Sequence, residues 1–292
     1  MKSWTETESK VRLPAVLDRS AALGRLVVAV VLLLTVWGTW SFGIWDPWEL
    51  VVADAARQLS QTGPDSVAHT PLSTSLISVA FDAFGIRDWS ARLPGVGAAW
   101  LTCLLTFVFL RTYESRRAAV IAIAVLASTP LFLLNARLLM GDSLGVFAQT
   151  WVGLSAIMLC SAPHVCRRAL AHWVLLALGV AVSTYASGVL LGPLPPMLAV
   201  AAWRLLSDDS QAGERLNRWL FPVAAAALAL GVARAISLDD PEFSFWLGGG
   251  AVGGNPPPFD KAAELVFHGF APWSAALPVA AIWVLVPRPV RP

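Results

Sequence analysis

Long apolar runs recur along the whole chain, separated by polar stretches and by stretches that contain Gly and Pro. A helix needs about 20 mostly apolar residues to cross the hydrocarbon core of a bilayer. Eight runs have roughly this length, at residues 24–44, 93–111, 117–135, 143–161, 169–187, 188–206, 218–236 and 267–287. The pattern therefore predicts an all-α, polytopic integral membrane protein with about eight transmembrane helices.

The connections between these runs differ greatly in length. The first long connection, residues 45–92, contains two stretches, 47–60 and 72–84, whose apolar residues recur at helical spacing along one face. Such stretches are typical of amphipathic helices that lie in the membrane interface. The second long connection, residues 237–266, is rich in Gly and Pro and is expected to be a loop. The fifth and sixth runs meet at Gly188, where only a tight hairpin fits.

Composition and charge support a membrane protein and orient it. The chain has 292 residues, of which 57% are hydrophobic and 14% are charged, whereas a soluble domain carries roughly 25% charged residues. On the eight-helix topology, 15 of the 21 basic residues fall on one side, which the positive-inside rule makes cytoplasmic. Both termini are then cytoplasmic, the long connections face the other side, and the expected location is the inner or plasma membrane of the cell. No nucleic-acid partner is expected.

The stretch GIWDPWELVVADAARQL, residues 43–59, places two carboxylates just after the first apolar run. Asp46 is a suitable N-cap, Pro47 suits the first helical position, and Glu49 follows as the third helical residue. This arrangement is a capping box, which needs no catalytic role. Asp142, in LLMGDSLG, can likewise cap the helix that follows it. All three carboxylates are nevertheless expected on the non-cytoplasmic side, where ionisable groups close to a membrane often mark a functional site.

The cysteines give little sign of a cofactor. Cys160 and Cys166 flank a short basic connection that contains His164, but this spacing matches no zinc-binding pattern. We interpret these cysteines as free thiols on the cytoplasmic side. The sequence identifies no metal site and no cofactor, and it leaves open a requirement for a divalent metal ion.

Five stretches of the chain, taken in order, resemble the polytopic C-type glycosyltransferases. The group concerned contains the dolichyl-phosphate-mannose–protein mannosyltransferases and the lipid A aminoarabinose transferases. The matching stretches fall within roughly residues 30–283 and read WDPWELVVADAARQL, AHTPLSTSLISVAFDAFG, IRDWSARLPGV, STPLFLLNARLLMGDSL and FHGFAPWSAALP. Each stretch is short, and their common order makes the resemblance specific.

The resemblance implies an inverting glycosyltransferase that takes a sugar from a polyprenyl-phosphate carrier on the non-cytoplasmic face. In such an enzyme a carboxylate of the first outer loop deprotonates the acceptor hydroxyl, and this catalytic role falls on Asp46 and Glu49. The family's second outer acid falls on Asp142. The residues that would bind the donor phosphate are Arg137, which precedes that acid, and His69, which stands in the family's Pro-Pro motif. A partnerless histidine at the membrane interface explains His69 equally well. The acceptor is left open between a lipid, a glycan and a protein.

The chain departs from the family pattern in several places. Valines at 51–52 replace an aromatic residue that often follows the first-loop acid, Thr70 interrupts the Pro-Pro motif, and Ser187 replaces a lysine. Members of the family are also longer. Residues 1–292 are therefore expected to form a single transmembrane domain that lacks the family's C-terminal part. The chain is then a truncated relative, a non-catalytic relative, or one half of a split enzyme whose C-terminal part a partner protein supplies. Two alternatives remain: a non-catalytic membrane subunit with a transferase-like scaffold and, less favoured, a transporter.

Overall fold

The protein is entirely helical over the residues that its computed structural model describes. These residues are 16–41, 43–44, 48–63, 71–139, 142–161, 166–206, 264, 267–276 and 279. The helices are α1 (Val16–Val36), α2 (Trp48–Thr62), α3 (Leu72–Phe84), α4 (Asp88–Tyr113), α5 (Arg116–Ser128), α6 (Pro130–Arg137), α7 (Ser143–Ser161), α8 (Cys166–Leu191), α9 (Leu194–Leu206) and the 3-10 helix η2 (Trp273–Ala276). No strand occurs in these residues, so the predicted all-α class is confirmed for them.

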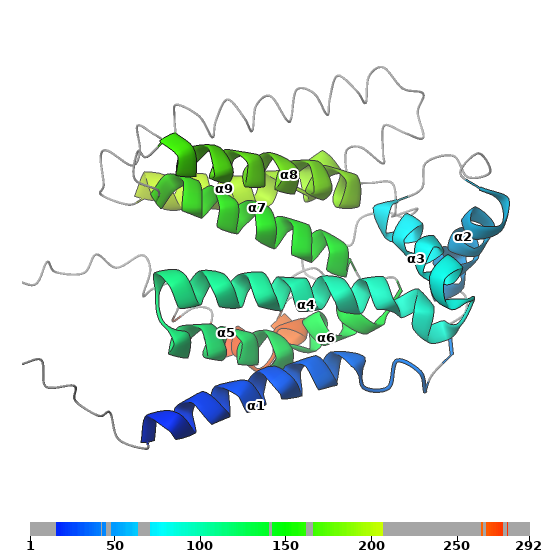
Figure 1. Cartoon of the computed structure of the whole chain (residues 1–292), viewed down its shortest axis with the longest axis horizontal. Helices are drawn as coiled ribbons and strands as arrows, with labels where there is room; N and C mark the ends of the chain where they lie inside the picture. Colours follow the sequence, from blue (N-terminus) through cyan, green and yellow to red (C-terminus); the bar gives the residue numbers. More distant parts are fainter. Residues whose placement is uncertain are drawn as a thin grey trace, which may run out of the picture.

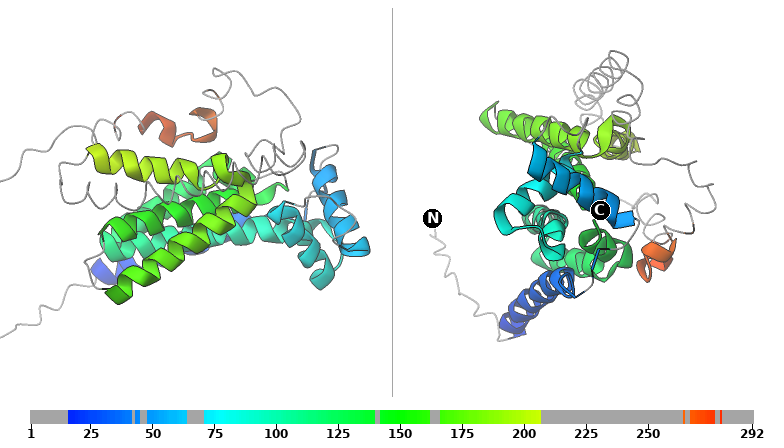
Figure 2. Two further views of the ribbon diagram at one scale, coloured as in Figure 1. Left: turned by 90° about the horizontal axis from the view of Figure 1, so that it is seen from above. Right: turned by 90° about the vertical axis from the view of Figure 1, so that its right-hand side faces the viewer.

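Most of the helices run side by side as one bundle. In Figure 1, α1, α5, α4, α7 and the α8–α9 pair run roughly along the long, horizontal dimension of the molecule and follow one another from bottom to top. Helix α4 is central, because it contacts α1, α3, α5, α6 and α7. The α2–α3 pair stands at one end of the bundle, beyond the beginning of α4 (Figures 1 and 2). The first long connection of the sequence therefore forms a cap over one end of the bundle.

Two helices in the described part of the chain are long and apolar enough to cross a membrane, namely α4 and residues Leu170–Val189 of α8. A third span is obtained if α5 and α6 count together as one bent helix. Stretches Ser143–Leu159 and Leu194–Trp203 are apolar but shorter. These helices make the chain an integral membrane protein, whereas the predicted number of eight spans is not confirmed. The predicted span at 218–236, and nearly all of the loop at 237–266, lie outside the described residues.

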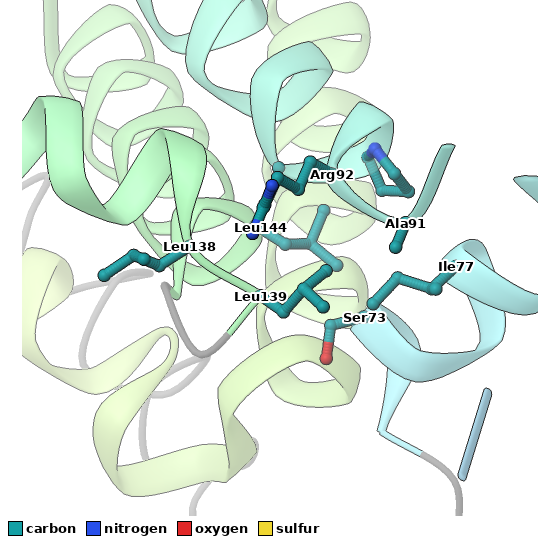
Figure 3. A pocket seen from close by; sticks show the side chains of 9 residues that line it. Ser73, Ile77, Ala91, Arg92, Leu138, Leu139 and Leu144 are labelled. Atoms are coloured by element: carbon teal, nitrogen blue, oxygen red, sulfur yellow. The ribbon is translucent and has the colours of Figure 1, made fainter. Parts of the chain in front are cut away.

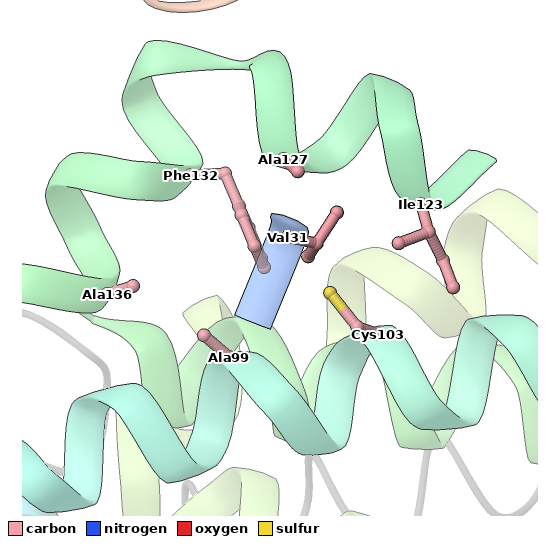
Figure 4. Packing of buried hydrophobic residues seen from close by; sticks show 7 residues of the cluster. All are labelled: Val31, Ala99, Cys103, Ile123, Ala127, Phe132 and Ala136. Carbon is pink, nitrogen blue, oxygen red and sulfur yellow. The ribbon is translucent and has the colours of Figure 1, made fainter. Parts of the chain in front are cut away.

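The span predicted at 117–135 is sharply bent. The axes of α5 and α6 differ by 69° on either side of Thr129. Proline lacks a backbone N–H and keeps the residue before it out of the helical region. Thr129, which precedes Pro130, is accordingly extended, with φ −81° and ψ 114°. The buried side chains that fill the inside of this bend against α1 and α4 are Val31, Ala99, Cys103, Ile123, Ala127, Phe132 and Ala136 (Figure 4).

The tight turn predicted near Gly188 is present. Gly188 interrupts α8 with φ 71° and ψ −179°, a conformation that glycine adopts far more readily than other residues. Helix α9 then begins at Leu194 and packs against α7 and α8. The side chains of Val152, Leu176 and Met197 form the centre of this contact, each with no more than 2% of its surface exposed.

The two stretches predicted as amphipathic helices in the first long connection are both helical. Helix α3 has the predicted bounds, and α2 extends two residues beyond the predicted range of 47–60. Their contact buries Ala56 and Phe81, with 0% and 3% of their surfaces exposed. The position of these helices in the plane of the membrane interface remains a prediction.

The last described segment differs from its prediction. Residues 267–287 are predicted as one transmembrane helix, but the helix is interrupted after Gly269, and η2 follows a turn. Pro272 lies in this turn, where it lacks the N–H that a continuing α-helix requires. Trp273 donates a hydrogen bond from its indole nitrogen to Ser128 Oγ at 2.8 Å. This segment therefore fastens to the outer corner of the α5–α6 bend.

Candidate functional site

Glu49 lies in the first turn of α2 and is almost fully buried, with 1% of its surface exposed. Its Oε2 pairs with Arg92 Nη2 at 3.0 Å, and its Oε1 accepts a hydrogen bond from the Leu139 backbone N–H at 2.9 Å. A buried carboxylate is tolerated only with partners of this kind, because losing water costs it several kcal/mol. Glu49 therefore joins α2 to α4 and to the connection between α6 and α7.

Arg92 extends this linkage to the segment that follows α1. Its side chain is buried in the second turn of α4. Besides pairing with Glu49, it donates hydrogen bonds to the carbonyls of Thr39 at 2.9 Å and Gly43 at 3.0 Å. No role for Arg92 is predicted from the sequence. The available signal was an arginine at the beginning of an otherwise apolar helix, which is costly unless the arginine has buried partners.

A small cavity lies directly beside Arg92. Its volume is about 20 Å³, which is room for roughly one water molecule. Side chains of α3, α4 and the α6–α7 connection line it, including Ile77, Ala91 and Leu139 (Figure 3). A cavity of this size excludes a sugar ring. The surroundings of the Glu49–Arg92 pair are thus closely packed, and a substrate has to approach from another side.

Arg137 is the last residue of α6 and lies beside the C-terminal end of α1. Its Nη2 donates a hydrogen bond to the carbonyl of Leu34 in the last turn of α1. A cation at this place is favourable, because the C-terminal end of a helix carries a partial negative charge and carbonyls without helical partners. Its Nε is buried and has no hydrogen-bond partner among the described residues. One nitrogen of Arg137 therefore anchors α1, and another retains the capacity to bind an acceptor.

Asp142 caps the N-terminus of α7, as the sequence predicts. Its Oδ1 accepts a hydrogen bond from the Gly145 backbone N–H at 2.9 Å, and its Oδ2 accepts one from the Ser187 hydroxyl at 3.0 Å. Desolvation by the surrounding protein raises the pKa of Asp142 above its ordinary value of 3.8, and the hydrogen bonds from Ser187 and Gly145 oppose this shift. The residue nevertheless remains exposed at the surface. Asp142 is therefore an accessible carboxylate held at the meeting point of two helices.

Gly145 makes this arrangement possible. A Cβ atom at this position would lie nearer than 3.0 Å to both carboxylate oxygens of Asp142 and to Ser187 Oγ. Ser187 itself lies directly before the break in α8 at Gly188. The three residues Asp142, Gly145 and Ser187, called the Asp142 cluster below, therefore join the beginning of α7 to the end of α8.

Two of the predicted site residues, Asp46 and His69, lie outside the described residues. Asp46 comes two positions before the first residue of α2. Its role as an N-cap, and the role of His69 toward phosphate, stay predictions. Among the described residues, the hydrogen bond to Leu139 brings Glu49 onto the short connection that begins after Arg137 and ends at Asp142.

In the part of the chain that the structure describes, no group of three or more His, Cys, Asp or Glu residues is placed to hold a metal ion. Cys103 is buried among apolar side chains between α4 and α5, with 5% of its surface exposed. Its surroundings are those of a packing residue rather than of a ligand.

Comparison with known proteins identifies the fold. No family model matches the sequence, and no curated protein matches it. The structure is similar to the crystal structure of ArnT from Cupriavidus metallidurans bound to undecaprenyl phosphate, with a TM-score of 0.70, 21% sequence identity, and coverage of 90% of this chain and 51% of that one. It is also similar to the same protein in the apo state, with a TM-score of 0.69, 19% identity, and coverage of 92% and 52%. The chain thus spans about half the length of ArnT, an aminoarabinose transferase, and over that length it has the C-type glycosyltransferase fold that its sequence resembles.

Proposed function

We propose that this protein is a membrane glycosyltransferase that moves a sugar from a polyprenyl-phosphate donor to an acceptor hydroxyl on the non-cytoplasmic face. The observation that carries the proposal is the likeness to ArnT over 90% of the chain, in a structure of ArnT that holds undecaprenyl phosphate. The five sequence stretches that resemble C-type glycosyltransferases support the proposal as well. They include α2 and the α6–α7 region, which contain the candidate site residues.

The reaction assigns a separate task to each polar group. Asp46 accepts the proton of the acceptor hydroxyl while the hydroxyl oxygen attacks the anomeric carbon. The bond between that carbon and the phosphate oxygen breaks, the polyprenyl phosphate leaves with the electron pair, and the anomeric configuration is inverted. Arg137 and His69 bind the departing phosphate, and Arg137 is suited to this because a guanidinium can bind two phosphate oxygens at once. Asp142 lies at the edge of the same site and contacts the sugar or the acceptor.

Glu49 serves this reaction by position rather than by proton transfer. Both of its oxygens accept hydrogen bonds, and a general base needs a free oxygen within reach of the proton that it removes. Through Leu139 it holds the short connection between Arg137 and Asp142. Of the two first-loop acids, Asp46 is therefore the better candidate for the general base.

A second candidate function is a non-catalytic membrane subunit that retains the transferase scaffold. The observation that favours it is the burial of Glu49, since one of the two expected catalytic acids is committed to an internal ion pair. The same scaffold would then bind a lipid phosphate without transferring a sugar. The two functions differ in whether undecaprenyl phosphate is released from a sugar-bearing donor.

The proposal is tested by incubating the full chain in proteoliposomes with a panel of undecaprenyl-phosphate sugars, aminoarabinose included, and candidate acceptors. The expected result is release of undecaprenyl phosphate with at least one donor. Asn and Ser both cap helices well, so Asp46→Asn and Asp46→Ser should fold normally. Both should still slow the release on the order of a hundredfold or more, because neither side chain accepts a proton.

Two other outcomes have distinct meanings. Full activity in both Asp46 variants would exclude Asp46 as the base. Binding of undecaprenyl phosphate without release from any donor would favour the non-catalytic subunit.

A further inference from the structure

A second cleft, far larger than the cavity beside Arg92, lies where the α2–α3 pair meets the beginning of α4. Its volume is about 250 Å³, and it is bounded by one face of α2, the end of α3 and the beginning of α4. On α2 it is lined by Leu50, Asp54 and Arg57, which share a helix face because they are spaced by four and three positions. The proposed transferase uses none of these residues. We call this feature the outer cleft.

The outer cleft is lined by charged residues of both signs, and only some of them form ion pairs. Arg57 is paired with Asp54 at 2.7 Å, so these two side chains neutralise each other. The other two charged residues, Arg87 and Asp88, stand at the beginning of α4 and are exposed. Neither forms an ion pair with any described residue. Among the described residues, the cleft therefore presents one guanidinium and one carboxylate that form no ion pair, on neighbouring residues.

The length of α4 predicts that the outer cleft lies at the depth of the lipid headgroups. Helix α4 has 26 residues and is therefore about 39 Å long, whereas the hydrocarbon core of a bilayer is about 30 Å thick. The beginning of α4, where Arg87 and Asp88 lie, is therefore expected to extend into the headgroup layer. Apolar side chains at and near the rim are exposed as well, with 47% exposure for Leu50, 54% for Phe84 and 51% for Ile86. Such side chains suit the boundary between acyl chains and headgroups.

We propose that the outer cleft binds the headgroup of a phospholipid of the phosphoethanolamine type. Arg87 would bind the lipid phosphate, Asp88 would accept hydrogen bonds from the primary ammonium, and the rim would contact the first part of the acyl chains. A phosphocholine headgroup has no N–H to donate, and a phosphoglycerol headgroup has no cation for Asp88. Among common headgroups the primary ammonium type therefore matches both unpaired charges.

The site is tested with the purified full chain by native mass spectrometry. The protein is exposed to equal amounts of phosphatidylethanolamine, phosphatidylcholine and phosphatidylglycerol with identical acyl chains, and the retained lipids are counted. The expected result is preferential retention of phosphatidylethanolamine. Because the charges are partly exposed, Arg87→Ala should lower its retention by about two- to fivefold. Asp88→Asn should abolish the preference over phosphatidylcholine and leave binding through the phosphate.

Arg111→Ala is the matched control, since Arg111 is an exposed arginine in the last turn of the same helix. It should leave the retention of all three lipids unchanged. Equal retention of the three lipids by the native protein would overturn the proposal, as would preference for phosphatidylglycerol. The same loss in Arg111→Ala as in Arg87→Ala would overturn it too, because it would show a general effect of charge. The sugar-transfer activity is not part of this measurement, so its outcome is independent of the proposed function.

Discussion

Replacing Gly145 by alanine tests the Asp142 cluster with a change of one methyl group. The new Cβ would come nearer than 3.0 Å to the carboxylate of Asp142 and to the hydroxyl of Ser187. The carboxylate has to move away, and it then loses the hydrogen bonds from the Gly145 N–H and from Ser187. Gly153, in the same helix, provides the matched control, since a Cβ there meets Pro196 Cβ at an ordinary distance of 3.5 Å.

The expected magnitude follows from three contributions. Loss of an N-cap costs about 1 kcal/mol, and loss of the Ser187 hydrogen bond costs about 1 kcal/mol more. Alanine in place of glycine within a helix gains about 1 kcal/mol, and this gain applies to both variants. We therefore expect Gly145→Ala to be destabilising by about 1 kcal/mol and Gly153→Ala to be stabilising by up to about 1 kcal/mol. The difference of about 2 kcal/mol corresponds to roughly 4–8 °C in Tm.

The assay is thermal unfolding of both variants in the same detergent and at the same scan rate, because unfolding of a membrane protein is often irreversible. A third variant, Gly145→Ala combined with Asp142→Ala and Ser187→Ala, removes the atoms that the methyl group would strike. In that background the penalty for Gly145→Ala should disappear. If Gly145→Ala is as stable as Gly153→Ala in the native background, the Asp142 cluster is not present as described.

The remaining predictions concern the buried pair, the pH dependence and the topology. Glu49→Ala should lower the free energy of unfolding by about 3–5 kcal/mol, because it leaves the buried Arg92 without its carboxylate. Glu49→Gln keeps an acceptor for Arg92 and should cost clearly less in chemical denaturation, and equal costs would argue against the pair. The raised pKa of Asp142 means that the folded state holds this proton more tightly, so its contribution to stability falls as the pH rises from the ordinary value of 3.8 through the raised value. Asp142→Asn should flatten that part of the curve of Tm against pH, and an unchanged curve would refute the assignment. On the predicted topology, a cysteine at Gln61 should react with an impermeant reagent from the non-cytoplasmic side and one at Ser115 from the cytoplasmic side, while labelling of both from one side would exclude α4 as a span.

Much of the fold could be predicted because local pattern decides it. The bounds of α3 and α7 coincide with the predicted ranges 72–84 and 143–161, since apolar periodicity and the flanking turn residues are written in the sequence at those places. The bend at Thr129 could also have been predicted, because Pro130 is present in the sequence. The span at 117–135 was predicted only from the length of its apolar run. That length is the same whether or not a proline within the run begins a second helix.

The candidate site could be predicted only where its contacts join residues that are close together in the sequence. The cap that Asp142 provides for α7 is local, and the hydrogen bond to Gly145 confirms it. The partner of Glu49 is 43 residues away in the sequence, and the partner of Asp142 on α8 is 45 residues away. No periodicity connects positions so far apart, and only the packing of the helices brings them together. The sequence could therefore mark these acids as candidates, but it could not distinguish a buried structural carboxylate from an exposed one.

The central claim is that this scaffold binds a polyprenyl phosphate through its phosphate group, and the most direct test is titration of the purified full chain with undecaprenyl phosphate. Undecaprenol, which has the same chain and no phosphate, serves as the control ligand. We expect saturable binding of undecaprenyl phosphate, much weaker binding of undecaprenol, and a loss of affinity of about ten- to a hundredfold in Arg137→Ala, since a hydrogen bond to a charged group contributes about 1.5–3 kcal/mol. Arg137→Lys should restore the affinity only in part, because lysine lacks the two-pronged guanidinium. Equal affinity for the two lipids, or no saturable binding of either, would contradict the claim.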